Sequence, residues 1–422
     1  MKTSFWKKRK DNKVFSNYIY LLLIQGANFI LPLIALPYLV ITLGSEKYGL
    51  VMIAQSLAIF FTILVDFGFN ISATREVAIL KNDKEKLSQY FWNIYLIKIF
   101  LILITFLILL LLITFIDKFN TEPSVYIFSF GLVIGQAIFP TWFFQGIEKM
   151  KMITIINVLA KVFFTISIFF FVLEPENFEY VPILNGLGFI ISGFFGFLYS
   201  LKYIKFISPK YNLIIKIVKE SRSLVVSNFA VNFYTSSNIL ILGFFGGDII
   251  AGVYASMEKL VVATKSIYLP LYQAMFPYLS SKPKIEIYKT IHKLIFPMLI
   301  IGSILSLFII FGSEDILSFV YNKDVLIVSY YKVFQILGLI ALLSALNMLF
   351  VTLLLPAIKA YKTRMKILST CAIVHVFLVL FLTNWLSIYG VAIAAVITEL
   401  LILIISYYYI KKTQNKKSFF LE

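Results

Sequence analysis

The feature that most constrains this chain is a series of twelve long apolar segments joined by short loops. Crossing about 30 Å of hydrocarbon as a helix takes about twenty apolar residues. Lipid offers no hydrogen-bond partner to an open backbone, and barrel strands of about ten residues are much shorter than these segments. The sequence therefore predicts an all-α, polytopic membrane protein with twelve transmembrane helices.

Basic residues alternate along the loops. The N-terminal tail holds six of them, whereas the first turn holds only Lys47. The second connection holds four and the third only Lys118, and the alternation continues to a basic C-terminal tail. Short loops rich in lysine and arginine stay on the cytoplasmic side. Both termini are therefore expected to face the cytoplasm.

Composition agrees with a lipid environment. Hydrophobic residues make up 60% of the chain and charged residues 14%, whereas soluble domains have about 25% charged residues. The net charge of +17 lies in alternate loops and not on one face, so it indicates topology and no nucleic-acid partner is expected. Cys371 is the only cysteine, which excludes an intramolecular disulfide and a cysteine metal cluster.

The longest cytoplasmic connection follows the sixth apolar segment. Within it, residues 211–220 alternate isoleucine and valine with lysine, as in an amphipathic helix at the membrane interface. We expect a cytoplasmic linker at 208–222, an N-terminal six-helix bundle at 1–207 and a C-terminal six-helix bundle at 223–422.

Two glycine pairs indicate an internal duplication. Gly44 and Gly49 bracket the first turn, and Gly247 and Gly252 bracket the corresponding turn of the second half, at an offset of 203 residues. Because both halves begin on the same side of the membrane, the duplication would be parallel. A third pair, Gly131 and Gly135, has the spacing typical of close helix packing, and Pro140 is expected to bend the fourth span.

Ionisable residues inside apolar segments are costly, about 2.5–3.5 kcal/mol each at mid-bilayer. They are Asp66, Lys98, Lys161, Glu258, Lys259, Lys265, Lys332 and Glu399. Lys98 and Lys332 are interpreted as reaching the interface with their long side chains, whereas Lys161, Lys259 and Lys265 are too deep to do so. Glu258 and Lys265 share one helix face and could pair. A water-filled cavity with uncompensated lysines would attract a phosphate or another acid.

Signatures of enzymes are missing. The chain has no P-loop, GxSxG or HExxH motif. His292 lies in a cytoplasmic connection, and His375 is interpreted as a packed, hydrogen-bonded residue and not as a ligand. We expect no enzyme activity, no cofactor and no metal site.

Several short motifs resemble those of a known family. They are Leu43-Gly44 with Tyr48-Gly49, Ala73-Thr74-Arg75-Glu76, Phe139-Pro140-Thr141-Trp142 with Gln145-Gly146, Leu242-Gly243, Gly252-Val253-Tyr254 with Glu258-Lys259, and Pro270-Leu271-Tyr272-Gln273 with Phe276-Pro277. In order and spacing they are similar to polysaccharide flippases of the Wzx type. These are exporters of O-antigen and capsule repeat units in the multidrug, oligosaccharidyl-lipid and polysaccharide exporter superfamily, and the likeness covers nearly the whole chain.

The resemblance implies two bundles of six helices around a central basic cavity that opens alternately to either side of the membrane. The implied substrate is an oligosaccharide repeat unit joined through diphosphate to undecaprenol. Implied partners are this lipid-linked oligosaccharide and membrane lipids, and a polysaccharide polymerase and a chain-length regulator are further candidates.

Site residues follow from the resemblance combined with the charge pattern. Lys161, Lys259 and Lys265 are expected to neutralise the diphosphate or acidic sugars, with Arg75 gathering the headgroup at the cytoplasmic mouth. Glu258 or Asp66 would orient these cations or carry a coupling proton. Of the basic residues, only Arg75 and Lys259 lie in motifs of the family; Lys161 is expected on physical grounds alone.

Two other functions stay open, with a small-molecule permease as a third. A cation-coupled drug exporter of the same superfamily would share the architecture, but its cavity should be more acidic. A membrane-embedded polymerase or glycosyltransferase would act on the same lipid-linked sugar, but the absence of a large outer loop disfavours it.

Overall fold

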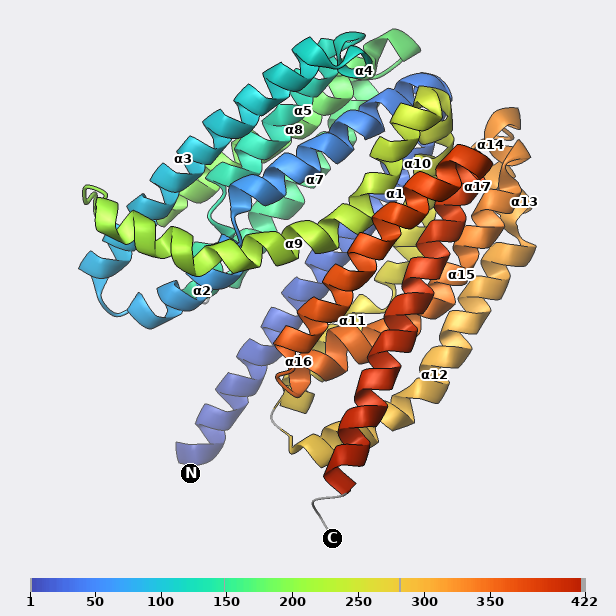
Figure 1. Cartoon of the computed structure of the whole chain (residues 1–422). Coiled ribbons are helices and arrows are strands. Elements are labelled where there is room, and N and C mark those ends of the chain that lie inside the picture. Colours follow the sequence, from blue (N-terminus) through green and yellow to red (C-terminus); the bar gives the residue numbers. More distant parts are fainter. Residues whose placement is uncertain (1, 148, 281, 419–422) are drawn as a thin grey trace. The chain divides into compact units, whose positions relative to one another are not determined.

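The computed structural model describes residues 2–147, 149–280 and 282–418, and these residues contain helices and no strand. In chain order the elements are α1 (Lys2–Asp66), α2 (Phe69–Leu80), α3 (Lys84–Phe115), α4 (Asp117–Asn120), α5 (Pro123–Ile138), α6 (Thr141–Gly146), α7 (Met150–Phe171), the 3₁₀ turn η1 (Pro175–Glu179), α8 (Tyr180–Ser200), α9 (Tyr211–Phe245), α10 (Gly247–Ser266), α11 (Leu269–Ser280), α12 (Lys284–Phe311), α13 (Ser313–Val320), α14 (Val325–Ser329), α15 (Tyr331–Asn347), the π-helix η2 (Met348–Leu354), α16 (Leu355–Ala357) and α17 (Tyr361–Ser418) (Figure 1).

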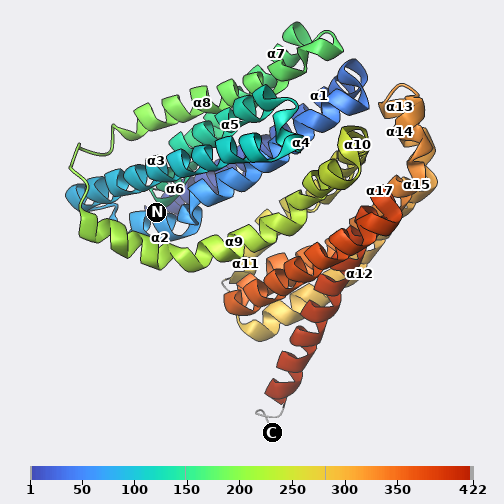
Figure 2. The same cartoon turned by 45° about the horizontal axis from the view of Figure 1, so that its top comes forward.

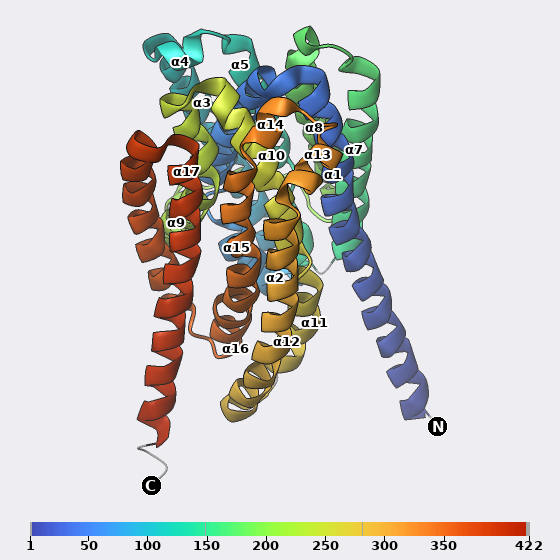
Figure 3. The ribbon, with the colours of Figure 1, turned by 90° about the vertical axis from the view of Figure 1, so that its right-hand side faces the viewer.

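Seven helical stretches of the described residues are long and apolar enough to cross a membrane. The predicted all-α, polytopic membrane fold is therefore confirmed, while the number of twelve spans stays a prediction. Two stretches, Leu33–Leu80 and Tyr361–Lys412, have 48 and 52 residues. Each contains a backbone interruption, at Gly44 (φ 69°) and at Ser387 (φ 48°). The two arms of α17 run side by side in Figures 1 and 3.

The chain forms two compact units. Unit 1 comprises Met1–Leu43 and Ile53–Phe229, and unit 2 comprises Gly44–Met52 and Ala230–Glu422. The turn of α1 around Gly44 thus packs with the second half of the chain. Residues 211–220, where an amphipathic helix is expected within the linker 208–222, form the first part of α9, which continues as one helix to Phe245.

Glycines allow a close helix contact in unit 1, between α5 and α8 (Figure 2). A Cβ built on Gly131 would lie 3.1 Å from the Gly186 Cα atom, and one on Gly135 would overlap the Phe189 carbonyl carbon. No larger residue fits at Gly135 without moving the backbone. The predicted packing role of Gly131 and Gly135 is confirmed.

Two of the sequence motifs pack against each other in unit 1. The Thr74 hydroxyl on α2 donates a 3.2 Å hydrogen bond to the Trp142 carbonyl on α6. A Cβ on Gly146 would lie 2.5 Å from Val77, so α2 and α6 approach closely there. Trp142 and Phe143 are fully buried beside Phe91, which gives this end of unit 1 an aromatic core. The contact fixes α2 and its exposed Arg75 relative to the helices that line the cavity described next.

In unit 2, α12, α15 and α17 pack lengthwise (Figure 3). The buried core around them includes Met298 and Ile402, together with Leu349 and Phe350 of η2. The tenth apolar segment changes from α15 to the π-helix η2 directly after Asn347. π-Helical turns are rare and often occur at functional sites, and Asn347 is one of the polar residues discussed below.

Candidate functional site

A helix break in unit 1 creates a site for a buried lysine. Pro140 lacks an N–H group, and α5 ends at Ile138. The carbonyls of this last turn therefore need other donors. Tyr95 on α3 donates a 2.5 Å hydrogen bond to the Ile138 carbonyl, and Lys98 Nζ lies 3.4 Å from the Ala137 carbonyl. A cation at a helix C-terminus is also favoured by the helix dipole.

Lys98 does not reach the membrane interface. Its side chain is buried, with 3% of its surface exposed, and its ammonium group points to the end of α5. The interpretation that Lys98 extends to the interface is therefore wrong. The sequence around Lys98 does not indicate this contact, because the free carbonyls that Lys98 faces arise from the break at the end of α5. Lys332 is exposed, as that interpretation requires.

Lys98 lines a cavity of about 290 Å³ within unit 1. The cavity is bounded mostly by polar side chains and lies among α1, α2, α3, α5, α6, α7 and α8. The residues that line it are Thr62, Val65, Asp66, Asn70, Lys98, Gln136, Ala137, Phe139, Thr141, Asn157, Lys161, Phe189 and Ser192. Two of the predicted site residues, Asp66 and Lys161, are thereby brought to one chamber although 95 positions separate them in the sequence.

The charges in this cavity are unequal. Asp66 accepts a 2.8 Å hydrogen bond from Asn70 and interacts electrostatically with Lys98. Lys161 is half-buried, and no hydrogen-bond or ion-pair partner for it exists among the described residues. With two lysines and one carboxylate, the chamber carries one formal positive charge. A site of this kind attracts anions.

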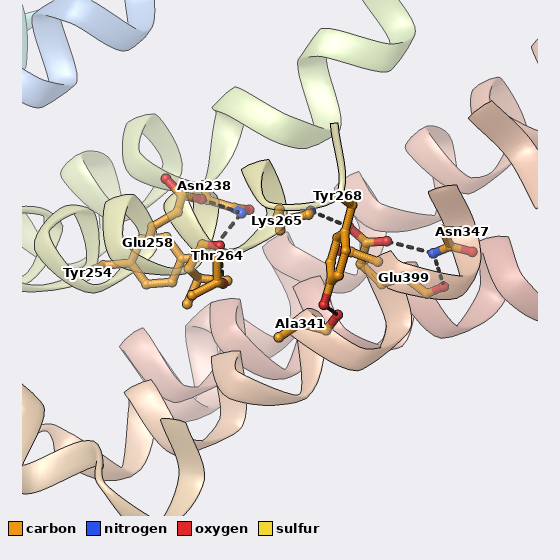
Figure 4. Close-up of polar contacts among 11 residues, drawn as sticks. Asn238, Tyr254, Glu258, Thr264, Lys265, Tyr268, Ala341, Asn347 and Glu399 are labelled. Carbon is orange, nitrogen blue, oxygen red and sulfur yellow. Dashed lines mark hydrogen bonds and ion pairs between the residues drawn. The ribbon is translucent and has the colours of Figure 1, made fainter. Parts of the chain in front are cut away.

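Unit 2 neutralises one of the predicted cations. Lys265 Nζ lies 2.6 Å from Glu399 Oε1, and the side chains are 33% and 10% exposed (Figure 4). Asn347 donates hydrogen bonds to the Glu399 carboxylate, at 2.7 Å, and to its carbonyl, at 2.9 Å. The ion pair that Lys265 makes is therefore with Glu399, and not with Glu258 on its own helix face.

Glu258 lies in a separate polar group of unit 2. Its carboxylate is 3.4 Å from the Asn238 side-chain nitrogen, which also lies 3.1 Å from the Tyr254 hydroxyl (Figure 4). Lys259 is half-buried, and its interaction with Glu258 is electrostatic, without a hydrogen bond among the described residues. Of the three predicted headgroup lysines, Lys161 and Lys259 therefore keep an ammonium group that no described acid pairs directly.

Uncharged amides were missed in the sequence. Asn70, Gln136 and Asn157 line the cavity, and Asn238 and Asn347 connect the charged groups of unit 2. Amides inside apolar segments are themselves costly to bury without a partner. Their presence at these positions was the signal that could have identified them.

Comparisons with known proteins agree with the fold. The family described as polysaccharide biosynthesis protein matches residues 14–283. A protein of Escherichia coli (strain K12), provisionally named as an O-antigen transporter, is 26% identical over 396 residues, which are 92% of this chain and 94% of that protein.

Solved structures are similar over most of the chain. An inward-facing multidrug resistance transporter of the MATE family and MOP superfamily has a TM-score of 0.73 and 15% identity, covering 95% of this chain and 99% of its own. The lipid II flippase MurJ, in an inward closed conformation, has a TM-score of 0.68 and 16% identity, covering 92% and 87%. At these identities the likeness shows the fold alone.

Proposed function

The chain belongs to the polysaccharide biosynthesis protein family, and on that premise we propose that it is a flippase for lipid-linked oligosaccharides. Its substrate would be a repeat unit of O-antigen or capsule joined through diphosphate to undecaprenol. Its place would be the bacterial inner membrane, with both termini in the cytoplasm. The relative named for O-antigen transport, which matches nearly end to end, supports this proposal.

The observation that carries the proposal is the unpaired Lys161 in a polar cavity with net positive charge. A diphosphate is a dense anion whose transfer through hydrocarbon needs compensating cations. Lys161 and Lys98 would supply them on the side of unit 1. Lys259 and Arg75 would bind the diphosphate at other points of its route across the membrane. Lys265 would bind it once the ion pair between Lys265 and Glu399 has opened. Asp66 and Glu258 would orient these cations.

Movement across the membrane would follow alternating access, in which the substrate site opens to one side at a time. A polysaccharide polymerase and a chain-length regulator would receive the repeat unit on the outer side. The cavity disfavours the alternative of a cation-coupled multidrug exporter, because two lysines against one carboxylate would repel a cationic drug.

A genetic experiment tests the function. In a strain that lacks its own copy, wild-type protein should restore surface polysaccharide, whereas Lys161→Ala should reduce it strongly and Lys161→Arg should retain part of it. Lys332→Ala is the matched control, because Lys332 is an exposed lysine outside the cavity. Immunoblots of membranes establish equal protein levels. Normal polysaccharide with Lys161→Ala at equal levels would remove the assigned site.

A further inference from the structure

His375 is a buried titratable group that the proposed headgroup site does not use. It lies in the first arm of α17, and 1% of its surface is exposed. Both ring nitrogens have close polar neighbours: Nε2 is 2.9 Å from the Asn238 Oδ1 atom, and Nδ1 is 2.8 Å from the Thr398 hydroxyl. The ring therefore connects α9 with the second arm of α17.

The neighbours of Asn238 fix which of its atoms faces the histidine. The Asn238 side-chain nitrogen is directed at the Glu258 carboxylate and the Tyr254 hydroxyl. The NH₂ group is therefore the donor to both, and it is the only part of the Asn238 side chain from which an ionised Glu258 carboxylate could accept. The Asn238 oxygen consequently faces His375 and can only accept. His375 Nε2 must carry a hydrogen.

The other ring nitrogen faces a group that can serve in either direction. The Thr398 oxygen lies 2.7 Å from the Ala394 carbonyl, and this carbonyl also interacts with the His375 ring. When the Thr398 hydrogen points to Ala394, its oxygen can accept a hydrogen bond from Nδ1–H. When the hydroxyl rotates, it can donate to an unprotonated Nδ1. Rotation about one bond thus satisfies both the imidazolium and the neutral ring.

From this geometry we propose that His375 is a reversible proton-binding site in unit 2, with Thr398 as the hydroxyl that adapts to each protonation state. Most buried polar groups are satisfied in one state only, and changing their charge leaves a donor or acceptor unpaired at a cost of about 1–3 kcal/mol. At these contacts His375 avoids this cost, because the Asn238 oxygen and the Ala394 carbonyl accept and the Thr398 hydroxyl rotates.

The charges around His375 give the proton an electrostatic consequence. On α10, Glu258 lies behind Asn238 with Lys259 beside it. On α17, Glu399 interacts with the ring and is paired with Lys265. Two carboxylates and two lysines balance, so protonation of His375 leaves this group with one net positive charge. By linkage, an acidic headgroup bound beside it and the proton would each strengthen the binding of the other. This coupling rests on the proposed function, whereas proton binding itself does not.

The chain contains only two histidines, which makes the site directly observable. His292 is exposed on α12, so the His292→Asn protein retains a single histidine in an intact unit 2. We would label this protein with ¹⁵N-histidine, reconstitute it in lipid bilayers and follow both ring nitrogens by NMR as a function of pH. We expect the ring to convert from the Nε2–H tautomer to the imidazolium as the pH is lowered from about 8 to about 3, because burial disfavours the charged ring. A ring that keeps one protonation state over this range, or a neutral ring with its hydrogen on Nδ1, would overturn the proposal.

Asn238→Asp combined with Glu258→Gln in the same background tests the direction, because the second change removes the carboxylate that lies 3.4 Å from the Asn238 side chain and would repel the new one. A carboxylate of nearly equal shape would face Nε2–H and favour the charged ring, which should move the midpoint to higher pH. A midpoint that stays unchanged or falls would contradict the contact between Asn238 and His375. If the titration appears but the wild-type protein transports no lipid-linked sugar, the proposed function fails and the proton site stands.

Discussion

Gly49 and Gly252 face each other across a contact that admits no side chain on either. A Cβ built on Gly49 would overlap the Asp248 carbonyl oxygen, and a Cβ on Gly252 would overlap the Ser45 carbonyl oxygen. Ser45 and Asp248 occupy corresponding positions in the two halves of the chain, because they too are 203 residues apart. The contact is therefore reciprocal, as two copies of one ancestral turn would make it.

Alanine at either glycine should destabilise unit 2. The obstructing atoms are backbone oxygens, so the segment Gly44–Met52 must move away from α10, at a cost of about 1–3 kcal/mol or more. Thermal unfolding of the purified protein in detergent measures the effect. Gly188→Ala is a matched control, because its added carbon would lie 3.2 Å from its nearest neighbour, the Ala160 carbonyl. Equal melting temperatures for Gly49→Ala, Gly252→Ala and the control would show that the close contact does not exist.

The sequence predicted those structural features that depend on the residue types within one helix. Close packing at Gly131 and Gly135 and the break at Pro140 depend on local residue types, and both are present in the structure. Pairings between helices could not be found in this way. Glu258 and Lys265 share a face, yet Lys265 pairs with Glu399, 134 positions away. Which helices become neighbours depends on tertiary packing, so the meeting of Asp66, Lys98 and Lys161 had no local signal.

The Lys265–Glu399 ion pair should stabilise unit 2 as a pair and not through either residue alone. Glu399→Gln leaves a partly buried ammonium without its acid, and we expect unfolding to become easier by about 1–3 kcal/mol. Lys265→Met alone leaves the carboxylate with Asn347 and should also destabilise the unit. The double variant should lose less unfolding free energy than the sum of the losses in the two single variants. A double-mutant cycle on thermal stability measures the difference, and strict additivity would contradict a direct interaction.

The N-terminus of α3 should lose protection in acid. Asp83 accepts a hydrogen bond from the Lys86 backbone N–H at 3.1 Å and forms an ion pair with Lys86 at 2.9 Å. The Lys86 backbone hydrogen bond is the main cause that lowers the pKa of Asp83 below its usual value of 3.8. A carboxyl whose pKa is lower in the folded state stabilises that state above its unfolded pKa, and this stabilisation is lost as the pH falls through the folded pKa.

Hydrogen exchange measures this effect at the first amides of α3. In the wild-type protein their protection should be constant near neutral pH and should decrease below about pH 4. Asp83→Asn keeps a capping oxygen without the charge, so its protection should lack this acid-dependent step. The same step in the Asp83→Asn protein would assign the effect to another group.

Pairing of the diphosphate with Lys161, on which the proposed transport of a lipid-linked oligosaccharide depends, is tested most directly in liposomes. Purified protein in liposomes, supplied with an undecaprenyl-diphosphate oligosaccharide from its own host, allows the rate of translocation to be measured by enzymatic labelling of the sugar on the opposite leaflet. We predict translocation by the wild type, a rate about 10- to 100-fold lower with Lys161→Ala, as expected for loss of a charged hydrogen bond, and partial activity with Lys161→Arg. Equal rates in the wild type, in Lys161→Ala and in protein-free liposomes would contradict the account.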